Sequence, residues 1–357
     1  MTTYPWLSKA ATWCSDRLPL DALRRFAEGK SVPRHKHSFW YYFGGLTLFF
    51  FSVQVVSGIL LALSYEPSPE HAYESVVSIV NEQMHGWFIR SVHSWSANLM
   101  VAMLFIHMFS GFLMKAYRRP RELMWISGTV LLLLVLGFGF TGYLLPWDTT
   151  AYFATLIGTE VPKSLPLVGT WGVELLKGGE EIGGRTLARM YSMHVIVLPL
   201  ITIMVVSFHL LLSQLSGSSI PVGTEVRKPP IRFFPNFLYR DFISWGLGFI
   251  ALVVLACMLP WGLAEKADPF ASAPPGIRPE WYFWPLYQTL KMVPAQIFTL
   301  NGEMLVNALV GLLIVFWLAV PFIDRRSARE RPSPVFTAIG LGAILYIVIT
   351  IGLAYAG

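Results

Sequence analysis

The feature that most constrains this chain is a series of seven apolar runs, each about 20 residues long. They lie at about 40–63, 86–112, 123–144, 187–213, 242–262, 303–322 and 335–355. A run of about 20 apolar residues is long enough to cross a hydrocarbon core of roughly 30 Å as a helix. Charged residues make up 13% of the sequence, which is about half the share found in soluble domains. The sequence therefore predicts an all-α, polytopic membrane protein with seven transmembrane helices, which we designate spans A to G in chain order.

The positive charges indicate the orientation of these spans. Nineteen of the 27 Lys and Arg residues lie in the N-terminal segment and in the B–C, D–E and F–G connections, which all fall on one side. Because Lys and Arg accumulate in cytoplasmic loops, we expect the N-terminus in the cytoplasm and the C-terminus on the periplasmic side. The net charge of +6 is then a topology signal, and a nucleic acid is not an expected partner.

Two of the spans each carry a pair of histidines. Span B contains His93 and His107, fourteen residues apart, and span D contains His194 and His209, fifteen apart. On an α-helix such steps advance about 21–22 Å and return to broadly the same face. Because B and D run in the same direction, the first histidines of the two pairs are expected level near the outer side, and the second near the inner side. A membrane histidine can instead form a hydrogen bond to a neighbouring helix or line a proton path. Two matched pairs favour haem iron held by two histidines, a ligation typical of electron-transfer haems.

Glycines on the two neighbouring spans repeat the same step. Gly44 and Gly58 in span A, and Gly128 and Gly142 in span C, are each fourteen residues apart. A flat macrocycle needs the adjacent helix to lack a side chain where it presses, although glycine also serves ordinary close packing of membrane helices. The combination predicts two non-covalent b-type haems inside a four-helix bundle of spans A to D. Arg90, one turn before the first histidine of span B, is a candidate partner for a haem propionate.

The E–F connection contains an aromatic motif around a single carboxylate. It reads Pro279, Glu280, Trp281, Tyr282, and the C–D connection opens with GYLLPWDTTAYFA at 142–154. Together with the histidine and glycine pairs, these motifs strongly resemble cytochrome b of the cytochrome bc and bf (Rieske/cytochrome b) complexes, over essentially the whole chain from about residue 30. The seven spans, with PREL at 120–123, resemble chloroplast-type cytochrome b and subunit IV fused into one chain, which suggests a bacterium.

The resemblance implies that these two connections form a quinol-oxidation pocket on the outer side. Oxidising a quinol releases two protons, so a base is needed there. Glu280 lies among aromatic residues, where desolvation disfavours its charged form, and such a carboxylate can accept a quinol proton and release it outward. Tyr282 and Tyr143 are candidate hydroxyl partners, and Pro279 and Trp281 complete the predicted catalytic set.

The resemblance also implies a mechanism and a set of partners. One electron from the quinol goes to a Rieske iron–sulfur protein and then to a c-type cytochrome. The second crosses from the outer haem to the inner haem and reduces a quinone, menaquinone or ubiquinone, on the inner side, so that electron flow builds a proton gradient. The expected setting is a bacterial inner membrane, and the complex is expected to be a homodimer.

The inner side offers fewer signals. Asp241, in YRDF at the start of span E, matches the position of an inner-site acid in the mitochondrial type, and it is the candidate quinone-binding residue there. The chloroplast-type branch attaches an extra haem through a cysteine two residues before the first glycine of span A, where this chain has Tyr42. A phenol cannot form the thioether bond, and neither Cys14 nor Cys257 lies near that position. No covalent haem is therefore expected.

Three segments are expected along the chain. They are a cytoplasmic N-terminal segment (1–38), a four-helix dihaem-binding bundle (39–215) and a three-helix C-terminal part with the quinol-site loop (216–357). A competing function is a dihaem membrane anchor of a dehydrogenase or hydrogenase. Such an anchor conducts electrons without bifurcation, which is the division of the two quinol electrons between two different acceptors. Such an anchor needs no second quinone pocket outside, so the motif at 279–282 favours the oxidoreductase. A transporter is a third alternative, but the broken-helix repeat typical of transporters does not occur in the sequence.

Overall fold

The computed structural model describes residues 5–19, 25, 28–165, 169–226 and 228–356. The predicted N-terminal segment is therefore described only in part. Two of the nineteen basic residues predicted on the cytoplasmic side, Arg24 and Arg227, lie outside the described residues.

Seven long helices in the described chain are apolar enough to cross a membrane, as predicted. They span Ser38–Ala62, Gly86–Leu113, Glu122–Tyr143, Gly184–Ser216, Phe233–Met258, Gly302–Ala328 and Pro334–Ala356. For six of these helices, most of the first and last residues lie within a few residues of the predicted bounds. The fifth begins earlier than the predicted residue 242, because Leu238–Asp241 are already helical. The segment FFPNF before them is kinked at Phe234, whose φ of −104° and ψ of 132° are not helical. The all-α, polytopic architecture is confirmed.

The individual helices of these spans have the following bounds. Span A is the 3-10 turn η1 (Ser38–Tyr41) and α3 (Tyr42–Ala62), span B is α5 (Gly86–Leu113), span C is α6 (Glu122–Tyr143), span D is α9 (Gly184–Ser192), the π-helical turn η2 (Met193–Val197) and α10 (Leu198–Ser216), span E is η3 (Phe233–Phe237) and α11 (Leu238–Met258), span F is α13 (Gly302–Ile323) and α14 (Arg325–Ala328), and span G is α15 (Pro334–Ala356).

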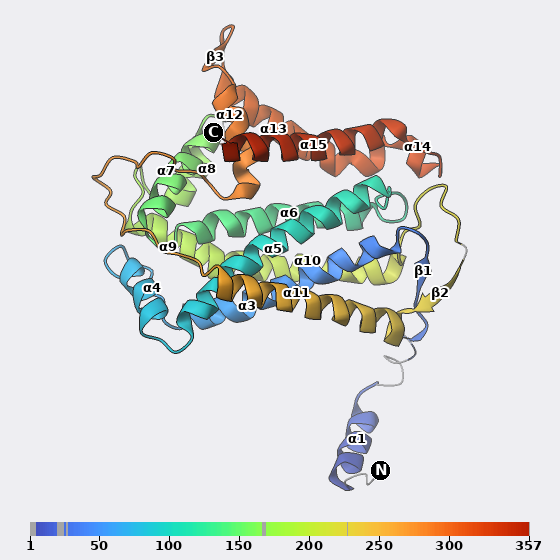
Figure 1. Ribbon diagram of the computed structural model, residues 1–357. Helices are drawn as coiled ribbons and strands as arrows, with labels where there is room; N and C mark the ends of the chain where they lie inside the picture. Colours follow the sequence, from blue (N-terminus) through green and yellow to red (C-terminus); the bar gives the residue numbers. More distant parts are fainter. Residues whose placement is uncertain (1–4, 20–24, 26–27, 166–168, 227, 357) are drawn as a thin grey trace.

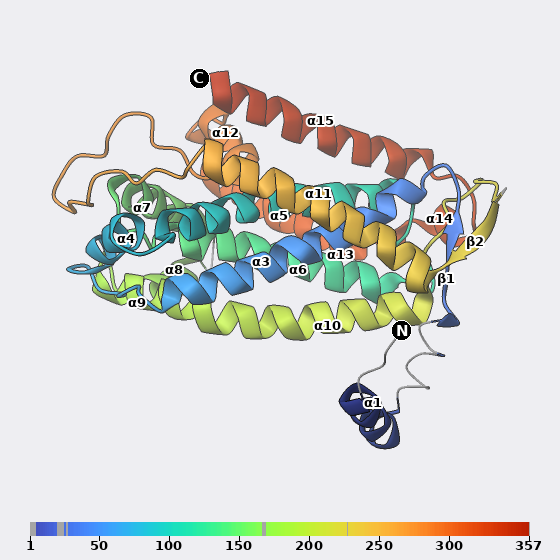
Figure 2. The same cartoon turned by 60° about the horizontal axis from the view of Figure 1, so that its bottom comes forward.

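The first four spans pack in two closely matched pairs. α3 runs along α5, α10 runs along α6, and α5 touches α6 between them, as Figures 1 and 2 show. The remaining spans flank this bundle: α11 lies against α3 and α5, α13 against α6, and α15 against α5. Every predicted histidine and glycine thus lies on a helix of the bundle, and no later span separates them.

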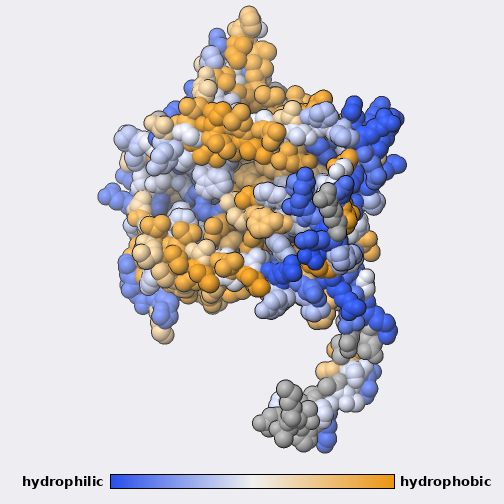
Figure 3. Space-filling model, turned by 45° about the vertical axis from the view of Figure 1, so that its right-hand side comes forward, coloured by the Kyte–Doolittle hydropathy of each residue, from blue (hydrophilic) through white to orange (hydrophobic). Residues whose placement is uncertain are grey.

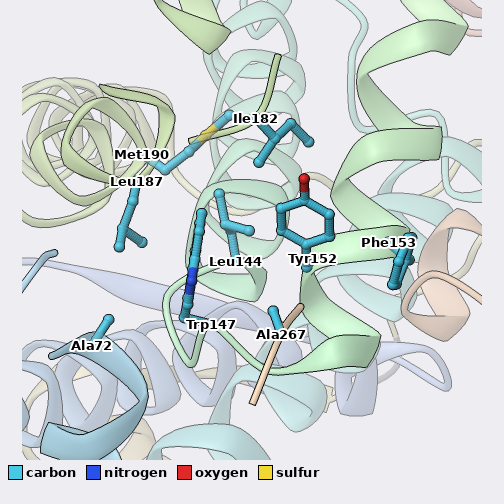
Figure 4. Close-up of a cluster of buried hydrophobic side chains, with 9 residues drawn as sticks. All are labelled: Ala72, Leu144, Trp147, Tyr152, Phe153, Ile182, Leu187, Met190 and Ala267. Atoms are coloured by element: carbon cyan, nitrogen blue, oxygen red, sulfur yellow. The ribbon is translucent and has the colours of Figure 1, made fainter. Parts of the chain in front are cut away.

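One end of the bundle carries most of the short connecting helices (Figure 1). These elements are α4 (Ala72–Asn81), α7 (Thr149–Lys163), α8 (Gly169–Lys177), the 3-10 turn η4 (Trp281–Phe283), α12 (Trp284–Met292) and the hairpin of β3 (Gln296–Ile297) and β4 (Leu300–Asn301). The carboxylate of Asp148 begins α7 by accepting a bond from the Ala151 main-chain N–H at 2.8 Å, which is a standard N-cap. Beneath α7, Trp147 and Leu144 pack with side chains from α4 and α9 in a buried cluster (Figure 4).

The opposite end, which we call the basic end, carries α14 and a two-stranded sheet of β1 (Ser31–Arg34) and β2 (Lys228–Arg232). The two strands are antiparallel and tie the segment before span A to the D–E connection. Helix α1 (Pro5–Arg17) lies apart from the bundle, below its side near this end in the views of Figures 1 and 2.

The surface between the two ends is apolar. Leu247, Leu312 and Val348, on three different spans, expose 65%, 67% and 61% of their surface. Figure 3 shows hydrophobic residues over much of the face in view, with the most hydrophilic ones gathered toward the basic end. Side chains of this kind facing outward on spanning helices are suited to a lipid environment, so the chain is a membrane protein.

Candidate functional site

The four predicted histidines lie in two pairs at two depths of the bundle. The rings of His93 on α5 and His194 in η2 face each other with their centroids 6.4 Å apart and their planes 69° apart. A metal–imidazole bond is about 2 Å long, so a metal held between the two rings fits a centroid separation of about 6 Å. Nearer the basic end, His107 and His209 are also close enough to interact electrostatically. The structure therefore brings together the pairs that the sequence predicted.

Each histidine ring faces one of the four predicted glycines. A Cβ at each of these positions would come within 3.4 Å of Cε1 of the ring, closer than ordinary van der Waals contact. The four distances are 3.2 Å for Gly58 and His93, 2.5 Å for Gly142 and His194, 2.9 Å for Gly44 and His107, and 3.2 Å for Gly128 and His209. The glycines therefore make room for the imidazole rings themselves. Their predicted contact with a macrocycle stays a prediction.

Three of the histidines are also held by a hydroxyl group, which the sequence analysis missed. The hydroxyl oxygens lie 2.9 Å (Ser57, His93), 2.9 Å (Ser127, His209) and 3.2 Å (Thr141, His194) from the Nδ1 atoms. Each hydroxyl donates its own proton to a main-chain carbonyl of its helix, so it accepts a bond from Nδ1–H. We infer the tautomer in which Nε2 carries the lone pair, which is the form that binds a metal. The missed signal was a Ser or Thr directly before three of the four glycines.

The unequal spacing of the two histidine pairs has a local explanation. His194 lies in the π-helical turn Met193–Val197, directly before α10. A π turn contains more residues than an α turn, and such turns are frequent at functional sites. The extra residue of the span D step is taken up in this turn, so the fifteen-residue step matches the fourteen-residue step of span B. The two pairs are therefore in register.

Arg90 has main-chain partners in the structure. It is 9% exposed, and its two terminal nitrogens donate to the carbonyls of Trp261 and Gly262 at 2.7 and 2.9 Å. These bonds support a role in holding the start of the E–F connection against α5. The predicted contact with a haem propionate stays a prediction.

Asp241 lies in the first turn of α11, at the basic end. Its carboxylate presses against α3, where a Cβ on Gly45 would overlap both carboxylate oxygens. Tyr42 lies in the same contact between α3 and the start of span E, stacked on Phe237 with centroids 5.0 Å apart and planes at 9°. Both residues discussed for the inner side therefore belong to one helix contact, and the quinone-binding role of Asp241 stays a prediction.

A cavity of about 450 Å³ lies between α5 and the E–F connection, at the end opposite the basic end. Four of its lining residues are members of the predicted catalytic set: Tyr143, Pro279, Glu280 and Trp281. Cavities of about 300–1,000 Å³ with mostly apolar walls and a few polar groups are typical of small-molecule sites. The cavity therefore has the size and lining of a site for an aromatic ring that carries polar substituents.

The acid at this cavity is poised to exchange a proton. Burial raises the pKa of the Glu280 carboxyl above its ordinary value, because desolvation disfavours the charged form. Tyr143, at the end of α6, is near enough to interact with it electrostatically. Such a carboxyl changes protonation state closer to neutral pH than an exposed glutamate does.

Tyr282 has a different position from the rest of the motif. It is 9% exposed, and its hydroxyl presses against Gly139 of α6, where any Cβ would overlap it. Burial, with the nearby charges of Glu280 and Tyr143, raises the pKa of its phenol. The ring anchors the motif to the bundle, and Gly139 is a contributor that the sequence analysis did not single out.

Comparison with known proteins agrees with these features. The family model described as Cytochrome b/b6/petB matches residues 28–217, and that described as Cytochrome b(C-terminal)/b6/petD matches residues 266–357. The chain is 49% identical over 350 residues to the cytochrome bc complex cytochrome b subunit of Chlorobaculum thiosulfatiphilum, across 97% of this chain and 81% of that protein. It is 41% identical over 216 residues to cytochrome b6 of Synechococcus elongatus, across 60% of this chain and 100% of that protein.

A solved structure also shares the whole fold. A chain of a hyperthermophilic respiratory Complex III superposes with a TM-score of 0.79 at 28% identity, and the match covers 97% of this chain and 96% of that one. Together the two family models cover most of the described spans on either side of the D–E connection. The chain belongs to the cytochrome b/b6 family, with the N-terminal and C-terminal family domains joined in one polypeptide.

Proposed function

We propose that this chain is the cytochrome b subunit of a quinol:cytochrome c oxidoreductase, a cytochrome bc complex in a bacterial inner membrane. Its similarity to a cytochrome bc complex subunit over 97% of the chain supports this assignment. The observation that carries it is the combination of two histidine pairs at two depths with a carboxylate-bearing cavity at one end of the same bundle.

The residues around each pair fit a bis-histidine haem. The ring spacing of His93 and His194, the glycines behind all four rings and the hydroxyls on three of the Nδ1 atoms support Nε2 as the metal-binding nitrogen. Bound to His93/His194 and His107/His209, two non-covalent b-type haems would supply a one-electron path along the bundle, beside the path through a Rieske partner.

At the cavity, Glu280 acts as the base. As a quinol O–H bond breaks, the proton passes to a carboxylate oxygen of Glu280 and the electron pair stays on the quinol oxygen. The raised pKa of this carboxyl favours accepting the proton, and general bases of this kind contribute about 10²–10⁴-fold to rates. Pro279 and Trp281 shape the wall on which the ring rests.

The same proposal includes the partners of the subunit and its orientation in the membrane. It works with a Rieske iron–sulfur protein and a c-type cytochrome, in a homodimeric complex, with its N-terminus cytoplasmic and the cavity on the periplasmic side. An inner-side quinone, menaquinone or ubiquinone, is bound near Asp241. The segments 1–38, 39–215 and 216–357 serve as cytoplasmic segment, dihaem bundle and C-terminal quinol-site part.

A reduced-minus-oxidised optical spectrum of the purified complex tests the proposal, together with quinol:cytochrome c reduction. We expect two b-type components, one lost in His93→Ala and the other in His107→Ala, and a quinol oxidation activity. A dihaem anchor of a dehydrogenase would show both components without that activity, and loss of the same component in both variants would contradict the pairing.

A further inference from the structure

In three of the tryptophans that line the cavity, the indole N–H is hydrogen-bonded to another group of the protein. At 2.7 Å in each case, Trp95 donates to the Leu259 carbonyl, Trp284 to the Pro279 carbonyl and Trp281 to the Asn98 side chain. An indole has one donor and no acceptor. These rings therefore shape the cavity wall, but their N–H groups are not free for a bound molecule.

The bond from Trp281 determines how the Asn98 amide is oriented. Because an indole only donates, the atom that receives this bond must be the amide oxygen Oδ1. The amide nitrogen then faces away from Trp281, and it donates one N–H to the Ser94 carbonyl at 3.0 Å. A side-chain amide has two N–H donors. One donor thus remains on a side chain that lines the cavity.

We propose that Asn98 is a quinol-binding residue: its remaining N–H donates to an oxygen of the bound quinol or quinone, while its Oδ1 holds Trp281 in place. This inference rests on the proposed function of the cavity. Trp281 directly follows Glu280 in the chain, so the Oδ1 bond ties the carboxylate-bearing turn to α5.

The chemistry of the reaction suits an amide at this position. When Glu280 takes a proton, negative charge develops on the quinol oxygens, and a directed N–H donor stabilises that charge. Asn98 does not titrate, so it does not compete with the quinol for the carboxylate as a protonated histidine or a lysine would. A donor fixed in advance by two other bonds also loses little entropy when the ring binds.

Two single variants and their combination separate the two roles of Asn98. Asn98→Leu removes both the donor to the quinol and the acceptor for Trp281, whereas Trp281→Phe removes the anchoring bond and the indole part of the cavity wall but keeps the donor of Asn98. Loss of one hydrogen bond to a bound oxygen corresponds to about a 3–10-fold fall in kcat/KM, and more if the oxygen is charged. We expect Asn98→Leu to be at least about 3-fold worse than Trp281→Phe, and the double variant to match Asn98→Leu. An equal fall in kcat/KM in both single variants would mean that Asn98 only holds Trp281 in place, which would overturn the proposal.

A spectroscopic readout tests the bond without turnover. Short-chain ubiquinone and menaquinone analogues, each ¹³C-labelled at the carbonyls, are bound to the purified complex and measured by infrared difference spectroscopy. A hydrogen-bonded carbonyl absorbs at lower frequency, so Asn98→Leu should raise the frequency of one carbonyl band, while Trp281→Phe should not. An unchanged band in Asn98→Leu would overturn the proposal.

Two further variants keep the test interpretable. Asn98→Asp keeps an acceptor for Trp281 and removes the donor, so it replaces Asn98→Leu if the latter fails to assemble, with the same expected band shift. Asn301→Asp is the matched control, because Asn301 caps α13 through a bond from the Met304 N–H at 3.0 Å and does not line the cavity. If the wild-type complex oxidises no quinol, the proposed function fails; if it does, and Asn98→Leu is normal, only the present inference fails.

Discussion

The hydroxyl oxygen of Ser57 lies 2.9 Å from Nδ1 of His93, and its own proton is donated to the Val53 carbonyl at 2.6 Å. The hydroxyl is therefore a fixed acceptor, and it directs Nε2 of the ring toward the opposite helix. Among the described residues no hydroxyl bonds the ring of His107, and Phe43 stands before Gly44 where the other three glycines follow Ser or Thr. The two histidines of α5 thus differ in the hydrogen-bond support of their rings.

Replacing Ser57 by alanine should change the properties of one haem only. A bond that accepts from Nδ1–H makes the imidazole a stronger electron donor to a metal, so its loss favours the reduced iron. We expect the midpoint potential of the His93/His194 component to rise by on the order of 40 mV, which corresponds to about 1 kcal/mol for one electron. Redox titration of the two optical components measures this.

Ser52→Ala is the matched control for this experiment. Ser52 lies on the same helix, is exposed, and bonds only to the Leu48 carbonyl at 2.9 Å. It should leave both components unchanged. A shift in the second component, or an equal shift in Ser52→Ala, would contradict the role assigned to Ser57.

A methyl group at Gly142 should displace His194. A Cβ there would lie 2.5 Å from Cε1 and 2.9 Å from Nδ1 of that ring, closer than van der Waals contact allows. We expect Gly142→Ala to lose the optical component assigned to His93/His194 while the other is retained. Gly111→Ala provides the comparison, because a Cβ at Gly111 on α5 meets nothing within 4 Å. Retention of both haems in Gly142→Ala would show that the ring does not need this space.

Most of the architecture was predictable because membrane spans and paired ligands leave periodic signals in the sequence. Long apolar runs indicate the seven spans, and histidine and glycine steps of fourteen or fifteen residues indicate the helices that face each other. The predicted start of span E is too late, because α11 begins at Leu238 and the kinked segment FFPNF before it contains proline and aromatic residues that are typical of a connection. Local hydrophobicity does not record that Phe237 stacks on Tyr42 of α3.

The details that set the chemistry were harder to predict. The π turn at His194 changes the direction in which the following residues face, and no residue type in the sequence indicates such a turn. The bond between Asn98 and Trp281 joins residues 183 positions apart, and nothing in either segment indicates its partner. Such contacts depend on how the E–F connection folds over α5, which is a property of the packed chain.

The activity should depend on pH through Glu280. A base must be deprotonated to work, so the rate of quinol oxidation should fall as pH decreases through the pKa of this carboxyl. Burial raises that pKa, so the fall should begin above the range of an exposed glutamate, whose pKa is about 4.3. In Glu280→Gln the rate should be about 10²–10⁴-fold lower, and this acid limb should disappear.

Glu174→Gln, at an exposed position of α8 outside the cavity, should keep the wild-type rate and pH profile. The optical spectra of both variants should retain two b-type components. If Glu280→Gln kept the wild-type rate and the same acid limb, another group would have to take the proton.

The chain should carry no covalent haem. The chloroplast-type branch binds its extra haem through a cysteine at the position of Tyr42, whose phenol here stacks on Phe237 at a centroid distance of 5.0 Å. A phenol forms no thioether, and Cys257 lies in the last turn of α11, whose first turn packs near Tyr42. Denaturing electrophoresis followed by a haem-peroxidase stain measures this directly, with the c-type cytochrome of the complex as the positive control. We expect that cytochrome to stain and the 40.2 kDa chain to remain unstained. A stained band at that mass that survives acid–acetone extraction would mean that another side chain of this polypeptide holds a haem covalently.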